Sequence, residues 1–273
     1  MQVHETAFVV STYRSYHENI SKDIYARLWN NPATDALIPD ILNSVSKHEA
    51  ILHSLRNRFF HESLQSFFKE NNKGCLINFG SGFSMYQFSL DNTLSTIEVD
   101  KKDIVDYKKE KVDLWTREGK LPSRDIQYAS IDFNHKTTEE IVASLTPLIK
   151  KKPTFIIIEG VFFFLNRQTT NKLFEVFKEL QKPGDKVGCV TYLPEVEKTD
   201  VYNRLLAYFD SNNDTNDSFS HQTIPHDYFL NINGYTLKEY TDEFDLCKKY
   251  VSDNKISNKS DILNESLFVL EKI

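Results

Sequence analysis

A glycine-rich turn, followed one apolar run later by an aspartate, is the pattern in this sequence that most clearly indicates chemistry. Gly80 and Gly82 follow the run 75–79, and Asp100 ends the run 94–99. Glycines after a strand let the backbone approach a ligand and adopt positive φ, while a carboxylate after the next strand can accept hydrogen bonds from ribose hydroxyls. The alternatives are a simple turn and a helix N-cap at Asp100, but the two motifs together favour an adenosine-type cofactor.

Two further carboxylates end apolar runs. Asp132 and Phe133 follow the run 126–131, where the carboxylate can accept from an adenine amino group and the ring can pack on the base, unless they form only a turn or a cap. Glu159 follows the run 154–158 and precedes more apolar residues. A carboxylate so enclosed requires a partner, either a ligand ammonium or an internal Arg or Lys.

The glycine turn does not match the fingerprint of dinucleotide-binding proteins. Met85 stands where the third glycine belongs, and the bulky Phe83 and Tyr86 would crowd a pyrophosphate at the helix N-terminus. A nicotinamide-dependent oxidoreductase is therefore the less favoured interpretation. S-adenosyl-L-methionine (SAM), with S-adenosyl-L-homocysteine (SAH) as its product, has an adenosine group without phosphate and is the predicted cofactor.

These residues are positioned by strands that alternate with helices. The five apolar runs, the last of which is 186–192, are separated by segments with helical patterns at 101–115, 137–149 and 167–181. This alternation predicts βαβ units and a mainly parallel sheet with the strands' carboxyl ends on one edge, where ligands bind. The segments 234–240 and 266–271 predict a closing antiparallel pair.

The flanking segments predict covers for that edge. Residues 1–70 are expected to be helical, with a single apolar period over 41–68, and the polar segment 210–221 is expected to be a mobile loop. We predict one domain with a helical cap (1–70), a cofactor-binding core (71–193), a substrate lid (194–233) and closing strands (234–273). Because the core strands serve the cofactor, the lid and cap must recognise the acceptor, with four candidate lining residues: Arg14, Tyr25, Tyr192 and Tyr202.

Composition limits the class of protein. The 273 residues are 40% hydrophobic and 26% charged, values that fit one large globular α/β domain. The net charge of -6 disfavours nucleic acid as a partner. The three cysteines form no CxxC motif and suit a reducing cytosol. With no signal-peptide pattern and no apolar run long enough to span a membrane, we expect a cytoplasmic protein without a metal site.

Five segments in chain order resemble the leucine carboxyl methyltransferase family, whose bacterial branch is usually labelled as O-methyltransferases of polyketide-type metabolism. The resemblance covers about residues 20–180, and its most specific elements are Glu98-Val99-Asp100 and the Glu159-Gly160-Val161 that follows Pro153-Thr154. The five segments are 55–60, 77–83, 97–100, 131–133 and 153–165.

This resemblance implies a class I methyltransferase fold, in which a seven-stranded, mainly parallel sheet has its last strand antiparallel. It assigns Arg56 to the methionine carboxylate and Glu159 to the methionine end of SAM. It also assigns the remaining residues to the methionine and ribose (Gly80, Gly82), the ribose hydroxyls (Asp100) and the adenine (Asp132, Phe133). Ser84, Phe164 and His61 depart from the residues frequent in the family, so the acceptor is less transferable than the cofactor.

The acceptor decides whether a base is required. A carboxylate is already a nucleophile at neutral pH, whereas a hydroxyl needs a group to take its proton. Because His135, His221 and His226 are all better explained as surface histidines, the sequence favours a carboxylate. It predicts a SAM-dependent O-methyltransferase acting on a carboxylate or hydroxyl of a small metabolite or peptide C-terminus, with a catalytically silent adenosyl-binding module as the alternative.

Overall fold

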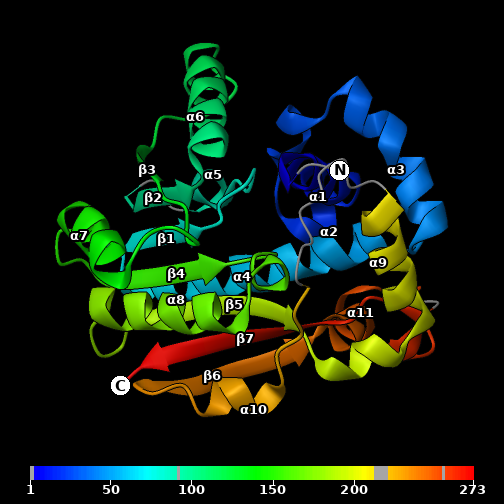
Figure 1. The fold of residues 1–273 in the computed structure, drawn as a ribbon. Coiled ribbons are helices and arrows are strands. Elements are labelled where there is room, and N and C mark those ends of the chain that lie inside the picture. Colours follow the sequence, from blue (N-terminus) through cyan, green and yellow to red (C-terminus); the bar gives the residue numbers. More distant parts are fainter. Residues whose placement is uncertain (1–2, 91–92, 212–220, 254–255) are drawn as a thin grey trace.

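The computed structural model describes residues 3–90, 93–211, 221–253 and 256–273. Within this part of the chain, one sheet has the strand order β3-β2-β1-β4-β5-β7-β6 (Figure 1). All pairings are parallel except those of β7, which is antiparallel to both neighbours. The strands are β1 (Cys75–Phe79), β2 (Ser95–Asp100), β3 (Asp125–Ser130), β4 (Thr154–Ile158), β5 (Lys186–Tyr192), β6 (Tyr235–Asp242) and β7 (Glu265–Lys272). The predicted mainly parallel sheet with an antiparallel last strand is confirmed.

The central strands β1 and β4 are buried along their whole length. This explains why they are continuous apolar runs, as expected for parallel strands covered on both faces. Alternate side chains enter two separate cores. Ile77 and Ile156 pack under α7 (Thr138–Ile149) and α8 (Arg167–Leu180), whereas Leu76 and Phe155 pack under α4 (Glu49–Glu70) and α11 (Glu243–Tyr250).

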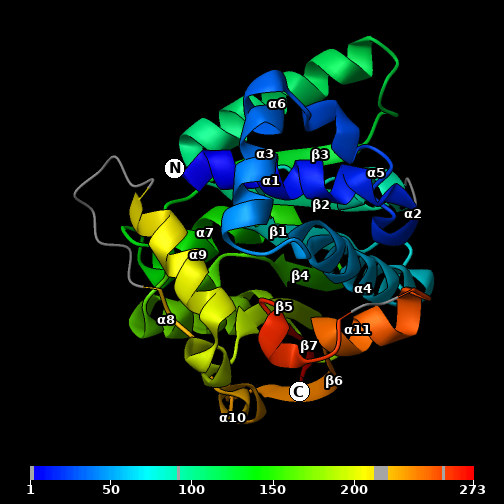
Figure 2. The same cartoon turned by 90° about the vertical axis from the view of Figure 1, so that its right-hand side faces the viewer.

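The strand order reverses between β1 and β4, and this reversal marks the ligand-binding edge of an open α/β sheet. The carboxyl ends of β4 and β5 point to the right in Figure 1, toward α1 (Val3–Tyr16) and α9 (Asp200–Ser211). Figure 2 looks onto this edge and shows α1, α3 (Pro32–Ser44) and α9 on the near side. Helices from the predicted cap and lid segments therefore cover the edge. Nearby shorter helices are α2 (Glu18–Ser21) and α5 (Tyr86–Ser89).

The apolar period predicted over 41–68 is divided between two helices, and its part from residue 51 onward lies in α4. Helix α3 ends at Ser44 and α4 begins at Glu49. Between them the Ser46 hydroxyl accepts a hydrogen bond from the backbone N–H of His48, at 3.2 Å. Such local side-chain bonds compete with helical hydrogen bonds.

Two further helices lie between strands of the sheet. Helix α6 (Lys102–Arg117) links β2 to β3, and α10 (His226–Leu230) precedes β6. Of the polar segment 210–221, predicted as a mobile loop, positions 212–220 lie outside the described residues, and Asp210 and Ser211 end α9. Among the described residues, none of the helices has the length and apolar character needed to cross a bilayer.

Candidate functional site

A cavity of about 450 Å³ lies at the carboxyl edge of the sheet, beside the reversal between β1 and β4. Its volume falls in the range of small-molecule sites. Thr6 and Val10 of α1 close one side of it. The cavity is lined by every residue that the sequence proposes for cofactor binding: Arg56, Gly80, Gly82, Asp100, Asp132, Phe133 and Glu159.

The backbone conformation of the turn at Gly80 and Gly82 favours glycine at both positions. Gly80 has φ +65° and Gly82 has φ +40°, in the left-handed region that favours glycine. A Cβ on Gly80 would stand 2.2 Å from Cγ2 of Val161, in the loop that follows β4. The turn is held against β2 by the Gly80 N–H, which donates to the Val99 carbonyl at 2.8 Å. Only glycine at position 80 lets these two loops meet at the cavity.

Asp100 ties the end of β2 to the glycine turn. Its Oδ2 accepts from the Gly82 N–H and its Oδ1 from the Lys101 N–H, both at 2.8 Å. Burial raises the pKa of Asp100 above its ordinary value, and these two hydrogen bonds oppose that rise. The N-cap of α6 is Lys101, so Asp100 is not the helix cap considered as its alternative role. Each carboxylate oxygen keeps a lone pair for a ribose hydroxyl.

We expect Asp100→Ala to weaken SAH binding by about 1.5–3 kcal/mol, the contribution of a hydrogen bond to a charged group. Isothermal calorimetry measures the affinity, and thermal melting followed by circular dichroism measures stability. The matched control is Asp106→Ala, an exposed aspartate of α6 that pairs with Lys102. Unchanged SAH affinity with a lower melting temperature would limit Asp100 to a structural role.

Asp132 and Phe133 form the wall after β3. Oδ1 of Asp132 accepts from the Asn134 N–H at 2.9 Å, and His135 Nδ1 lies 3.0 Å from Oδ2. Phe133 is buried and packs against Phe79 with ring centroids 5.7 Å apart. The turn considered for Asp132 is therefore present, and both residues also line the cavity.

Arg56 and Glu159 form a largely buried ion pair in the lining of the cavity. Arg56 Nε donates to Glu159 Oε1 at 2.8 Å, and its Nη1 donates to Glu265 Oε2 at 2.5 Å. Glu159 Oε2 also accepts from the Tyr86 hydroxyl at 2.7 Å. Burial alone would lower the pKa of Arg56, but Glu265 and Glu159 raise it above its ordinary value, so the guanidinium stays charged. The internal arginine considered as a partner for Glu159 is present.

A buried pair beneath the glycine turn was not predicted from the sequence. Lys108 Nζ lies 2.7 Å from Glu98 Oε2, and both side chains are fully buried. Lys108 also donates to the Ser81 carbonyl at 3.3 Å, and Asn78 donates to Glu98 at 3.2 Å. The helical spacing that places Lys108 one turn after Ile104 on the buried face of α6 would have revealed it.

A second cavity of about 140 Å³ adjoins the first. Both are lined by Arg56, Gly160 and Phe164, together with Thr6 and Val10. Phe164 therefore stands between the two cavities.

Of the four residues predicted to line the acceptor site, two line a cavity and two do not. Arg14 lines the first cavity, where it donates to Asp23 at 2.9 Å and to the Phe83 carbonyl at 3.0 Å. Tyr192 lines the second. Tyr25 packs edge-on against Phe88, and Tyr202 packs near Tyr192; neither lines either cavity. Ser84, which differs from the residue frequent in the resembled family, also lines the first cavity.

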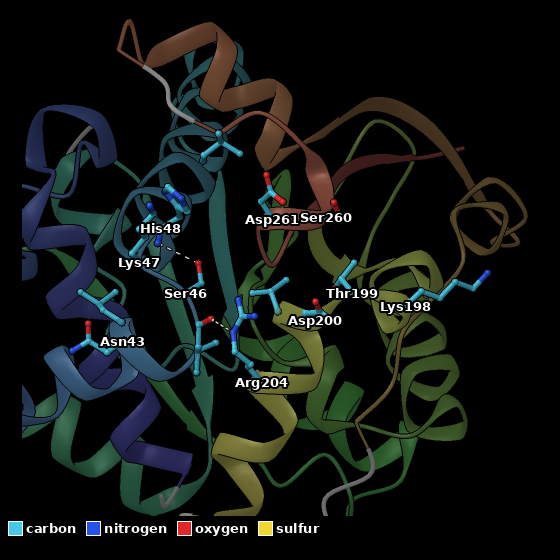
Figure 3. Close-up of a pocket in the computed structure, with 14 residues that line it drawn as sticks. Asn43, Ser46, Lys47, His48, Lys198, Thr199, Asp200, Arg204, Ser260 and Asp261 are labelled. Atoms are coloured by element: carbon cyan, nitrogen blue, oxygen red, sulfur yellow. Dashed lines mark hydrogen bonds between the residues drawn. The ribbon is translucent and has the colours of Figure 1, made fainter.

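A larger hollow of about 750 Å³ lies away from the glycine turn, where the α3–α4 junction meets the start of α9 (Figure 3). Arg204 there donates to the Val45 carbonyl at 2.9 Å, and Lys198 extends away from the other labelled side chains. None of the residues predicted for the cofactor lines this hollow. Size alone therefore does not make it the site, because the strand-end residues converge elsewhere.

A family model described as leucine carboxyl methyltransferase matches residues 13–178. No curated protein matches the chain.

Solved structures share the fold at low sequence identity. A protein from Thermobifida fusca described as a methyltransferase has a TM-score of 0.63 at 11% identity, covering 89% of each chain. A DUF574 family protein from Streptomyces avermitilis has a TM-score of 0.60 at 12% identity, covering 96% of this chain and 97% of the other. Magnesium protoporphyrin IX methyltransferase from Synechocystis, solved with bound SAH, has a TM-score of 0.52 at 10% identity, covering 95% and 98%. Because the family model spans more than half of it, the chain belongs to the leucine carboxyl methyltransferase family and is a SAM-dependent methyltransferase.

Proposed function

We propose that the protein transfers the methyl group of SAM to an oxygen atom of a small-molecule acceptor. The observation that carries this proposal is the contact between the two cavities at Arg56, Gly160 and Phe164. A compound in the second cavity would lie beside the amino-acid end of a cofactor in the first.

The residues of the first cavity fit SAM along its whole length. Asp100 has lone pairs for the ribose hydroxyls, and Asp132 and Phe133 lie where an adenine would follow. At the other end, a zwitterionic amino acid needs one cation and one carboxylate, and Arg56 and Glu159 supply both. When bound, SAM supplies a sulfonium methyl that moves to the acceptor oxygen while the C–S electron pair remains on sulfur.

The protein's own contribution is positioning and exclusion of water. Val10 of α1 and Phe164 line both cavities, so apolar side chains from the cap and the core enclose the place where they join. Holding two reactants in one enclosed site replaces a bimolecular encounter and removes competing water. No side chain has to carry the methyl group itself.

A transfer assay with methyl-labelled SAM tests this function. The acceptor panel contains aromatic carboxylic acids, phenols and amines of matched size. We expect label in an oxygen-linked product, and alkali distinguishes the two kinds, since methyl esters release methanol and methyl ethers do not. Label transferred to the amines alone would contradict oxygen specificity. SAH binding without transfer to any compound of the panel would favour the silent binding module.

A further inference from the structure

The second cavity contains polar atoms that have no protein partner. Among the described residues, the Tyr13 hydroxyl, Glu49 Oε1 and His53 Nδ1 are buried and make no hydrogen bond. Tyr13 is 2% exposed and Glu49 is 5% exposed, and both line the cavity with His53. Buried polar atoms are nearly always hydrogen-bonded in native proteins. Three such atoms on one cavity wall indicate a ligand with its own polar group.

These three side chains are placed together by two helices. Glu49, His53 and Arg56 occupy successive turns of α4 and line the same cavity. The His53 ring stacks on Tyr13 of α1 with centroids 5.5 Å apart and an interplanar angle of 13°. His53 Nε2 faces Glu49 Oε2 at 3.8 Å, which leaves Nδ1 as the ring atom without a partner.

Much of the remaining lining is apolar, although Thr6, Tyr192, Tyr208 and Glu265 also contribute to it, and the space is small. The apolar side chains that line the cavity include Val9, Ile41, Phe163, Leu205 and Phe209. Its volume of about 140 Å³ is close to that of a buried apolar cavity of about 150 Å³ that holds benzene. The cavity therefore accommodates a single ring or an aliphatic group of similar size.

A charged group would be poorly stabilised in this cavity. Arg56 is the only Arg or Lys among the described residues that line this cavity, it pairs with Glu159 and Glu265, and the proposed function assigns it to the SAM carboxylate, so no cation is left for an acceptor carboxylate. An ammonium would lie beside the Arg56 guanidinium, while Glu265 is already paired with Arg56 and burial raises the pKa of Glu49, which favours its neutral form. Buried ions are costly unless a partner compensates them.

Two titratable side chains of the cavity, Glu49 and His53, have pKa shifts that both favour the uncharged form. Burial, with help from Glu265, raises the pKa of Glu49 to about 8. Burial, with help from Arg56 and Arg14, lowers the pKa of His53 well below its ordinary value. Both shifts favour the neutral form, as expected of an environment that disfavours charge of either sign.

We propose that the second cavity binds the methyl acceptor as an uncharged, single-ring hydroxyl compound whose hydroxyl group hydrogen-bonds to Tyr13, Glu49 and His53. This inference rests on the proposed function and selects the hydroxyl over the carboxylate that the sequence favours. When the acceptor oxygen is methylated, its proton passes to His53 Nδ1, and the site gains no net charge because the sulfonium loses its positive charge in the same transfer.

Binding to the SAH-saturated protein tests the proposal without any turnover. The probes are p-cresol, p-toluate and p-methylbenzylamine, which share one ring and differ in charge, and calorimetry measures each affinity. The diagnostic variant is Tyr13→Phe, which removes a hydroxyl that has no protein partner and should leave the melting temperature unchanged. Tyr16→Phe is the matched control, since Tyr16 is 49% exposed on the same helix.

We expect p-cresol to bind more tightly than the two charged probes, and Tyr13→Phe to weaken it by roughly three- to tenfold, the contribution of one hydrogen bond. Tyr16→Phe should leave it unchanged. Equal or tighter binding of p-toluate or the amine, no binding of p-cresol at millimolar concentration, or insensitivity to Tyr13→Phe would each overturn the inference. A wild-type protein that does not bind SAH would instead overturn the proposed function.

Discussion

Arg56→Ala is expected to weaken SAH binding by roughly 100-fold or more while changing adenosine binding by less than about fivefold. The two ligands share the nucleoside and differ in the amino-acid end, whose carboxylate requires a cation. Arg56 is the arginine that pairs with Glu159 at the cavity wall, and the two should act on the same end of the ligand. Glu159→Ala is therefore expected to show the same selective loss. Calorimetry with both ligands on each variant measures the difference.

The Arg56 variant should also be less stable, by about 3–5 kcal/mol, because Glu159 and Glu265 would remain buried without their cation. Titrations must therefore be made well below its melting temperature. Arg58→Ala is the control, since Arg58 lies on the same helix, pairs with Glu62 and does not line the cavity. Equal losses for SAH and adenosine would reduce the Arg56–Glu159 pair to a structural salt bridge.

Lys108→Met is expected to lower the free energy of unfolding by about 3–5 kcal/mol, because it leaves the Glu98 carboxylate buried without a cation. It also removes the donor to the Ser81 carbonyl in the glycine turn, so SAH affinity should fall as well. Urea unfolding measures the stability change, and calorimetry measures the affinity.

The next residue of the same helix gives the control for this prediction. Lys109 pairs with Asp113 in an ion pair that is about half exposed, and exposed pairs contribute little. Lys109→Met should therefore leave stability and affinity nearly unchanged. The double variant Lys108→Met with Glu98→Gln should recover much of the loss. If Lys108→Met were as stable as Lys109→Met, the pair would not support the turn.

The sheet could be predicted from sequence because several of its strands are short, mostly apolar runs of residues. Runs 75–79, 154–158 and 186–192 match β1, β4 and β5 at both ends, since strands covered on both faces are mostly apolar rather than alternating. The break between α3 and α4 could not be predicted, because apolar residues continue on both sides of it and the local Ser46–His48 hydrogen bond leaves no mark in the apolar pattern.

The gathering of the candidate cofactor residues at one edge could be predicted where these residues follow strands. Gly80, Asp100, Asp132 and Glu159 each sit at a strand's end, so parallel topology alone brings them to one edge. Glu265 and Tyr86 were missed because their roles arise from tertiary contacts with Arg56 and Glu159.

The polar set of the second cavity was missed although its spacing was visible. Glu49, His53 and Arg56 recur at intervals of four and three residues, which places them on one face of a helix. Because candidate bases are expected at strand ends, the histidine on this helix face is overlooked. Position on α4 and the approach of Tyr13 from α1, rather than a strand end, put His53 at the cavity.

Titration of the wild-type protein with SAH and with NAD, in parallel calorimetric experiments, tests the cofactor site most directly. We predict one SAH bound per chain, and weak or undetectable binding of NAD, whose pyrophosphate the glycine turn with Phe83 and Met85 does not suit. Binding of NAD in the absence of any SAH or SAM binding would contradict the assignment.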